Sequence, residues 1–404
     1  MLLVLSAGCA MTPRPEVSLG VIAEPAFAPS LERGTRAPIV TGNRVEVLLN
    51  GDEIFPAMLR AIQGARQTIT YAQYVYEEGP VAREMAEALA ERCRAGVGVK
   101  ILLDGFGSLG MPPEYPALLR RSGCDVEWFR PLHVLQLHRF NHRNHRRILV
   151  VDGRLGFTGG SGVSEKWMGD GRAEGHWRDT DVRVEGPIVR GLQDAFAESW
   201  YQASGRRLAR DQAYYPALEP RGPVAAQVVR SSPAEGSFAI YTLFLLSINA
   251  ARRSISITNP YFVPDVALED ALTRAVGRGV RVVVLVPGMI DHNLVRQASR
   301  GRFGRMLEAG VEIYEYSPAL LHAKTMVVDG LWATVGSANL DNRSLALNTE
   351  LNLTAFDPEL ARRLEEVFQA DLRVSRRVTY ETWDSRGLVD RLLELAALPI
   401  QDLL

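Results

Sequence analysis

The stretch Asn144-His145-Arg146-Arg147-Ile148-Leu149-Val150-Val151-Asp152 decides the fold, because a second version of it follows 177 residues later. The second version reads Leu321-His322-Ala323-Lys324-Thr325-Met326-Val327-Val328-Asp329. Each copy has a cation two residues after a histidine and ends in an aspartate, and the apolar, β-branched run between them predicts a strand. Because alternate side chains of a strand share a face, each histidine and its cation should point into one site.

The order of the elements around the motif is also repeated along the chain. In each half we expect a strand, a helix, a buried strand, a second helix and a short strand before the motif strand. From the first helix onward these four elements are expected at 81–95, 99–104, 115–122 and 125–129, and at 266–277, 280–286, 295–309 and 311–316. Alternating strands and helices predict an α/β fold with a mixed sheet flanked by helices.

The repeat therefore predicts two tandem α/β units, at 42–210 and 224–373. We expect the units to be related by pseudo-two-fold symmetry. With one motif in each unit, the site is expected where the two motif strands face each other, because pockets are common at domain interfaces.

Composition limits the class of protein. A chain of 404 residues is long enough for two domains of ordinary size. A net charge of -1 argues against a protein held on nucleic acid by bulk charge. Three cysteines, Cys9, Cys93 and Cys124, do not make a disulfide scaffold. Cys93 and Cys124 could pair in an oxidising compartment, but we expect two unpaired thiols.

The two ends of the chain differ from the repeated body. Residues 1–10 form an apolar run that ends at Cys9 and Ala10; it is too short to span a bilayer and resembles the end of a bacterial lipoprotein signal. The proline-rich residues 11–41 are expected to be an extended tether. Leucines at helical spacing in 374–404 predict a helical tail that packs on the core or lies on a membrane surface.

The motifs and the turns after them resemble those of the phospholipase D superfamily, and more narrowly those of bacterial cardiolipin synthases. The resemblance covers nearly the whole of 42–373. The matching stretches are 144–147, 159–160, 177–180, 185–187, 259–264 and 336–339.

The resemblance implies an enzyme that transfers a phosphatidyl group through a covalent phosphohistidine. His145 and His322 would be nucleophile and general acid, and Arg147 and Lys324 would bind the phosphate oxygens. Two further residues, Ser337 and Asn339, match the phosphate-binding turn of the family. The carboxylate expected behind His322 is Glu350, and the one expected behind His145 is Asp179. Asp152 and Asp329 complete the motifs, with a structural role expected at the strand ends.

Two departures from the family pattern affect the first motif. Arg147 replaces the usual lysine, and Gly160 and Gly162 stand where the second half has Ser337 and Asn339. We expect backbone amides or Ser161 to bind phosphate in the first half. A glutamate behind His322 would stabilise its imidazolium, which suits the acid and leaves His145 as the nucleophile.

Other interpretations remain open from the sequence. The implied substrates are phospholipids, phosphatidylglycerol above all, at a membrane surface, with no nucleic acid, metal or cofactor; the N-terminal signal implies a periplasm-facing lipoprotein. The alternatives are a hydrolytic phospholipase D, a nuclease and a lipid-binding protein without activity.

His138, His142 and His145 have the spacing of metal ligands, but no cysteine or carboxylate cluster accompanies them. Alternation of Tyr71, Tyr74 and Tyr76 predicts core positions rather than ligand contacts.

Overall fold

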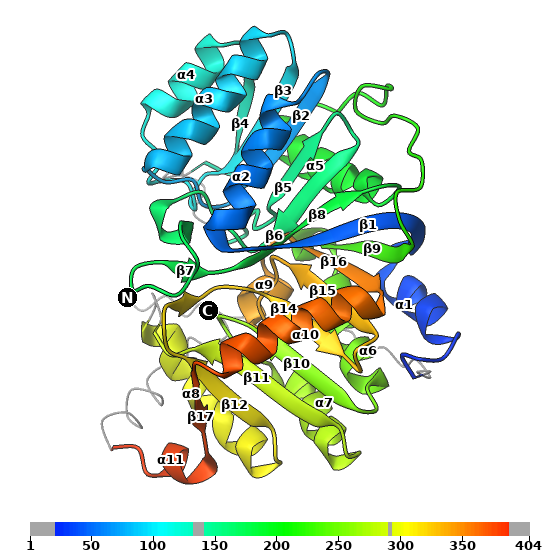
Figure 1. Ribbon diagram of the computed structural model, residues 1–404, viewed down its shortest axis with the longest axis vertical. Helices are drawn as coiled ribbons and strands as arrows, with labels where there is room; N and C mark the ends of the chain where they lie inside the picture. The colour runs from blue at the N-terminus through cyan, green and yellow to red at the C-terminus, as the bar shows by residue number, and fades with distance from the viewer. Residues whose placement is uncertain (1–20, 132–140, 290–292, 388–404) are drawn as a thin grey trace, which may run out of the picture.

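The computed structural model describes residues 21–131, 141–289 and 293–387. In these residues the predicted α/β fold is confirmed. Fifteen strands form one mixed sheet in the order β17-β12-β11-β10-β14-β15-β16-β9-β1-β8-β6-β5-β2-β3-β4. Figure 1 shows the two halves one above the other, with β1 and β9 between them.

The sheet order is the same in both halves when it is read outward from β1 and from β9. Seven strands of the first half correspond one by one to seven of the second, which is the pseudo-two-fold symmetry that the repeat predicts. The first-half strands are β1 Val40–Leu49, β8 Thr180–Glu185, β6 Leu155–Gly159, β5 Ile148–Val151, β2 Thr68–Gln73, β3 Gly98–Asp104 and β4 Asp125–Phe129. Their counterparts are β9 Val224–Ser231, β16 Glu350–Phe356, β15 Trp332–Gly336, β14 Thr325–Val328, β10 Ser254–Thr258, β11 Arg281–Pro287 and β12 Glu312–Tyr316.

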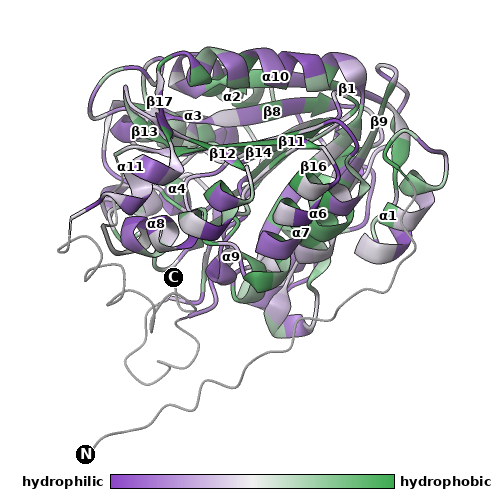
Figure 2. Cartoon of the chain, turned by 90° about the horizontal axis from the view of Figure 1, so that it is seen from below, coloured by the Kyte–Doolittle hydropathy of each residue, from purple (hydrophilic) through white to green (hydrophobic). Residues whose placement is uncertain are grey.

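Helices cover both sides of the strands, as Figure 2 shows for α2 and α10 on one side and α6 and α7 on the other. The helices of the first half are α2 Asn50–Gln63, α3 Pro80–Arg94, α4 Glu114–Arg121 and α5 Val189–Ser204. Those of the second half are α6 Ala239–Ala250, α7 Val266–Gly277, α8 Asn293–Glu308, the short α9 Asn342–Ala346 and α10 Pro358–Leu372. No described helix is long and apolar enough to cross a bilayer.

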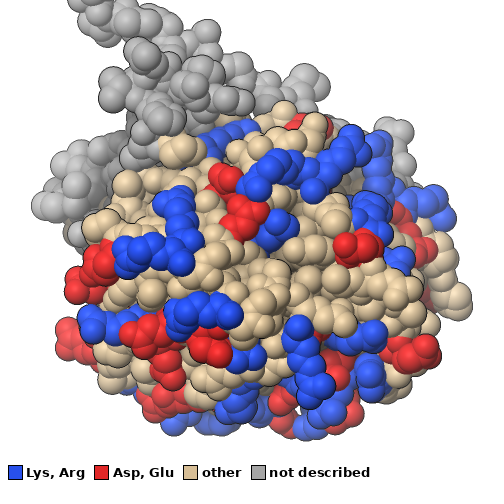
Figure 3. All heavy atoms as spheres, turned by 90° about the horizontal axis from the view of Figure 1, so that it is seen from above, with Lys and Arg blue, Asp and Glu red and all other residues tan. Residues whose placement is uncertain are grey.

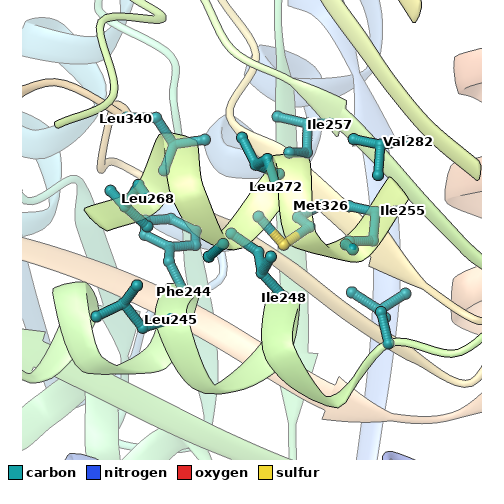
Figure 4. Close-up of a cluster of buried hydrophobic side chains, with 14 of the residues drawn as sticks. Phe244, Leu245, Ile248, Ile255, Ile257, Leu268, Leu272, Val282, Met326 and Leu340 are labelled. Atoms are coloured by element: carbon teal, nitrogen blue, oxygen red, sulfur yellow. The ribbon is translucent and has the colours of Figure 1, made fainter. Parts of the chain in front are cut away.

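The core of the second half explains why α6 is apolar on nearly all sides. Phe244, Leu245 and Ile248 of this helix are buried, and Figure 4 shows Phe244 and Ile248 among side chains of α7 and of the motif sheet. Burying such side chains is the main driving force for folding, at roughly 25 cal/mol for each Å² of apolar surface. The apolar pattern around the motif thus determines where the motif strands lie.

The expected tether differs from the structure, whereas the described part of the expected tail packs on the core, one of its two expected positions, but begins with a strand. Residues Phe27–Thr35 form helix α1, which packs on α6 through Phe27 and Leu31 rather than extending into solvent. In the expected tail, Ser375–Val378 forms strand β17 beside β12, and Tyr380–Asp384 forms helix α11. In helix α1, the burial of Phe27 and Leu31 against the core outweighs the effect of the nearby prolines. The expected lipoprotein signal with Cys9 and the leucines from Leu388 onward lie outside the described residues.

Cys93 and Cys124 form a disulfide, so the expectation of unpaired thiols was wrong. Cys93 is near the end of α3 and Cys124 immediately precedes β4, and the fold brings their Cα atoms to 5.4 Å. This separation lies in the usual range for a disulfide. The spacing alone could not decide it, because the two cysteines are 31 positions apart in the sequence, with a strand and a helix between them.

Candidate active site

The two motif histidines are held by backbone hydrogen bonds that cross between the halves. The His145 amide donates to the Thr349 carbonyl at 2.9 Å, and the His322 amide donates to the Arg178 carbonyl at 2.7 Å. The second contact extends a short parallel pairing of β13 Leu320–Leu321 with β7 Trp177–Arg178. Each histidine is therefore tied to the residue that precedes a carboxylate of the opposite half.

This crossing exchanges the carboxylates, so the expected pairing within each half was wrong. Glu350 accepts from Nδ1 of His145 at 2.8 Å, and Asp179 accepts from Nδ1 of His322 at 2.7 Å. All four side chains are buried. A carboxylate on Nδ1 fixes the ring and its tautomer, which leaves Nε2 for chemistry. The sequence identified all four residues but not the exchange, because the partners are 205 and 143 residues apart.

The two motif cations are buried beside the histidines. Arg147 donates to the carbonyl of His145, and Lys324 does the same to the carbonyl of His322. The Lys324 ammonium also lies 2.8 Å from Nδ1 and 3.0 Å from Nε2 of the His322 ring. Nε of Arg147 is buried without a hydrogen-bond partner among the described residues. A buried donor without a partner is costly, so this atom is available to bind an anionic oxygen.

The turn after the second motif supports the histidine of the first. Ser337 hydrogen-bonds the Glu350 carboxylate at 2.5 Å, and it also accepts from the Leu351 amide. Asn339 is buried, and its side-chain oxygen has no partner among the described residues. Ser337 therefore acts on Glu350, whereas Asn339 has an atom left for a ligand.

In the first half a tryptophan holds the carboxylate of Asp179, as Ser337 holds that of Glu350 in the second half. Nε1 of Trp167, in the 3-10 turn Glu165–Trp167, donates to Asp179 at 2.8 Å. This explains Gly160 and Gly162: a Cβ at Gly160 would lie 2.3 Å from an Asp179 oxygen, and one at Gly162 would lie 2.7 Å from the Trp167 ring. Ser161, expected to bind phosphate, instead donates to Asp181 at 2.7 Å.

Aromatic rings flank both histidines, and the sequence analysis missed this role. Tyr74 meets the His145 ring edge-on at 4.7 Å, although the tyrosine stripe was expected to be core. Tyr71 and Tyr76 are indeed buried core residues. Trp167 and Trp177 lie 5.2 and 5.1 Å from the His322 ring. One feature could have indicated the position of Tyr74 beside His145. Tyr74 directly follows β2, and the end of β2 lies beside the start of motif strand β5.

Burial and the two cations lower the pKa of both histidines. For His145 the causes are burial and then Arg147 and Lys324, which place its pKa well below the usual 6.5. Burial and Lys324 lower the pKa of His322 to about 4, against the opposing effect of Asp179. The two carboxyls differ. Burial raises the pKa of Glu350 to about 8, whereas His322 and Lys324 outweigh burial at Asp179 and lower its pKa.

The motif aspartates lie at the other ends of the motif strands and touch neither histidine. Asp152 accepts hydrogen bonds from the amides of Arg66, Gln67 and Thr68. Asp329 accepts from the amides of Arg252, Arg253 and Ser254. Both adopt a positive φ, of 52° and 55°, at the turn that follows the strand. They bind β5 to β2 and β14 to β10, which is the structural role expected of them at the strand ends.

Metal-like spacing does not produce a metal site in the described residues, where no group of three His, Cys, Asp or Glu side chains is placed to hold an ion. Nδ1 of His142 contacts the Leu347 carbonyl at 2.9 Å, and His145 is engaged with Glu350. His138 lies outside the described residues.

Comparisons with known proteins assign the chain to a family. The family model described as "Cardiolipin synthase, PLD-like domain" matches residues 58–200 and 245–372. A phosphatidylserine synthase structure from Haemophilus influenzae superposes with a TM-score of 0.73 at 13% identity, covering 93% of this chain and 100% of that one, which supports the fold. The chain therefore belongs to the phospholipase D superfamily.

Two relatives narrow this assignment. The major cardiolipin synthase of Bacillus subtilis is 36% identical over 87% of this chain and 73% of its own length. Cardiolipin synthase A of Pseudomonas aeruginosa is 38% identical over 91% of this chain and 74% of its own. Within the superfamily the chain is a phosphatidyltransferase of the cardiolipin synthase family.

The aspartates give a first prediction. Asp329→Ala should lower the free energy of unfolding by about 2–4 kcal/mol, since three amides lose a buried charged acceptor. Turnover per folded molecule should stay within about twofold, because Asp329 is remote from His322. Urea denaturation and initial rates measure both, with Glu219→Ala as the exposed-carboxylate control. If the Asp329→Ala protein folded but had no activity, Asp329 would have to take part in catalysis.

The lowered histidine pKa values predict acid sensitivity. Below pH 6.5 the unfolded chain takes up protons that folded His145 and His322 do not, so stability should fall as the pH drops from 6.5 toward 4. Each histidine contributes up to about 1.4 kcal/mol per pH unit. The variant His145→Asn/His322→Asn should show a flatter profile in urea titrations; Glu350 acts in the opposite direction but is common to both proteins. Parallel profiles would contradict the buried neutral histidines.

Proposed function

We propose that this enzyme makes cardiolipin, by moving the phosphatidyl group of one phosphatidylglycerol onto the terminal hydroxyl of another. The observation that carries the proposal is the paired arrangement of His145–Glu350 and His322–Asp179, with Arg147 and Lys324 buried between them. Two histidines whose Nδ1 atoms are engaged by carboxylates, and two cations, match what phosphodiester exchange requires: a nucleophile, an acid and charge for the non-bridging oxygens.

The proposed reaction has two balanced steps. Nε2 of His145 attacks phosphorus, the bond to the glycerol oxygen breaks, and His322 gives its proton to the departing oxygen. His322 then takes the proton of the acceptor hydroxyl, whose oxygen attacks phosphorus as the bond to His145 breaks. Arg147 and Lys324 hold the non-bridging oxygens in both steps, and the unpaired Nε of Arg147 is one of the donors.

The assignment of roles rests on the family resemblance and on Asp179. The pKa of Asp179 is lowered, so it stays anionic and opposes the lowering of the His322 pKa, which nevertheless lies at about 4. One observation points the other way: with the pKa of Glu350 raised to about 8, the His145–Glu350 pair retains an extra proton at neutral pH, as an acid would. Binding of the anionic phosphodiester raises the pKa of both histidines, and the nucleophile must be identified directly.

Hydrolysis uses the same residues with water as the acceptor, and it is the second candidate. Burial of the histidines, at 7% and 5% exposure, limits the access of water and favours transfer. A nuclease is disfavoured, because a net charge of -1 gives no bulk attraction to nucleic acid; Figure 3 shows Lys and Arg interspersed with Asp and Glu over the end of the first half that is in view.

The proposed location is the periplasmic face of a bacterial membrane. The support is the sequence around Cys9, which resembles a lipoprotein signal, and the bilayer-bound substrate. Incorporation of labelled fatty acid into the wild type and not into Cys9→Ser tests this attachment.

Incubation with phosphatidylglycerol vesicles tests the activity. Lipid mass spectrometry should show cardiolipin and free glycerol, with undiminished rates in excess EDTA because Arg147 and Lys324 supply the positive charge. His145→Ala and His322→Ala should each lose more than about 99% of the rate, a loss of about 2.7 kcal/mol or more, and the double variant should be no worse. Phosphatidic acid as the main product would make the enzyme a hydrolase instead.

An intermediate trapped during turnover identifies the nucleophile. Phosphohistidine survives an alkaline quench, so peptide mass spectrometry should find the phosphatidyl adduct on the peptide that contains His145. His322→Ala should accumulate this adduct with a donor that has a good leaving group, since such a donor needs no acid. An adduct on the His322 peptide alone would reverse the two roles.

A further inference from the structure

We infer that exposed apolar side chains of two symmetry-related loops form the surface that docks on an anionic phospholipid bilayer and brings the site to its substrate; this rests on the proposed function. The loops follow β3 and β11, which occupy equivalent places in the two halves of the sheet. The apolar side chains are Phe106 and Leu109 in the first loop and Met289 in the second, and the three are called the apolar rim below. They are 40%, 60% and 40% exposed.

The first loop lies against the residues that support His145. Ser108 donates to the Tyr74 carbonyl at 2.9 Å, and a Cβ on Gly107 would lie 2.8 Å from the Tyr74 ring. Tyr74 in turn contacts His145. At the start of the loop, Asp104 accepts from the Asn144 amide at 2.9 Å, immediately before the catalytic histidine. Phe106 and Leu109 thus project from the wall of the active site.

The second loop has the equivalent position beside His322. β11, which precedes Met289, pairs in parallel with β10, and β10 pairs with motif strand β14. The Asn259 amide, just after β10, donates to Leu285 near the end of β11. The side chain of Asn259 holds the Leu340 amide of the phosphate-binding turn at 3.1 Å. The carboxyl ends of the parallel strands in both halves therefore meet at the site, and the apolar rim stands at these ends.

Charge beside the rim favours an anionic surface over a neutral one. The guanidinium of Arg143 lies 5.8 Å from the Phe106 ring, but it is buried and is paired with Asp104 at 3.7 Å. Arg130, whose carbonyl accepts a hydrogen bond from Arg143, is partly exposed, and so is Arg343. Arg343, on α9, is near enough to lower the pKa of His145. Exposed apolar side chains with cations behind them are the pattern of interfacial membrane binding: the apolar groups enter the headgroup region and the cations attract anionic lipids.

Two other exposed aromatic residues serve as matched controls, because they lie at the opposite ends of the strands. Tyr201, 50% exposed, is near the end of α5, where Arg206 pairs with Asp125 at the start of β4. Tyr380, 41% exposed, follows Val378, which pairs with Ile313 near the start of β12. Neither belongs to the face around the histidines.

The experiment compares Leu109→Asp/Met289→Asp with Tyr201→Asp/Tyr380→Asp, two variants with the same change in charge. All proteins are full-length and carry Cys9→Ser, so that no acyl chain anchors them. Binding is measured by co-sedimentation with vesicles of phosphatidylglycerol and of phosphatidylcholine. The rim variant should bind phosphatidylglycerol vesicles at least about tenfold more weakly than the control variant, since it loses buried apolar area and adds two charges facing the lipid.

A soluble substrate separates this inference from the proposed function. On short-chain phosphatidylglycerol below its critical micelle concentration, the rim variant should react at the rate of its parent. Equal loss of vesicle binding in the control variant, or unchanged binding in the rim variant, would overturn the docking surface while leaving the transferase in place. Absence of transfer on the soluble substrate in every protein, the parent included, would instead refute the proposed function, and equal binding to both kinds of vesicle would refute the preference for anionic lipid.

Discussion

The site depends on one constraint, the exchange of carboxylates between the two halves. Each histidine is bound through its amide to the opposite half, and the next residue of that half supplies its carboxylate. Neither half contains a complete histidine–carboxylate pair. The exchange gives a physical reason for keeping both α/β units in one rigid arrangement, because a shift between them would break both pairs at once.

Two buried arginines reinforce the interface where the exchange occurs. Arg146, between the first histidine and its cation, points away from them; it donates to the Ala195 carbonyl of α5 and to the Glu350 and Ser231 carbonyls of the second half. Arg178 is paired with Asp371 of α10 at 3.1 Å. Buried arginines are costly unless every donor is satisfied, and here the partners come from both halves. The neighbours of the catalytic residues therefore hold the units together.

Symmetry is imperfect in a way that suits the chemistry. Transfer needs two histidines with different roles, and the surroundings of the two pairs differ accordingly. A serine supports Glu350 and a tryptophan supports Asp179, and the pKa values of the carboxyls shift in opposite directions. His322, the Lys324 ammonium and the Trp167 indole close to Asp179 outweigh burial and lower its pKa, whereas burial dominates at Glu350. The two halves place their histidines on equivalent strands, and the supporting side chains make the surroundings of the two histidines different.

The sequence by itself determined the α/β fold, the duplication, and the histidines and cations of the two motifs, because local periodicity and spacing encode them. The carboxylates Glu350 and Asp179 were identified through the resemblance to the family. The tertiary structure decided what depends on contacts between distant segments. These are the exchange of Glu350 and Asp179, the Cys93–Cys124 disulfide, the helix at 27–35 and the approach of Tyr74 and Trp167 to the histidines. No local pattern records which half a strand end will face; the arrangement of the two halves along one continuous sheet determines it.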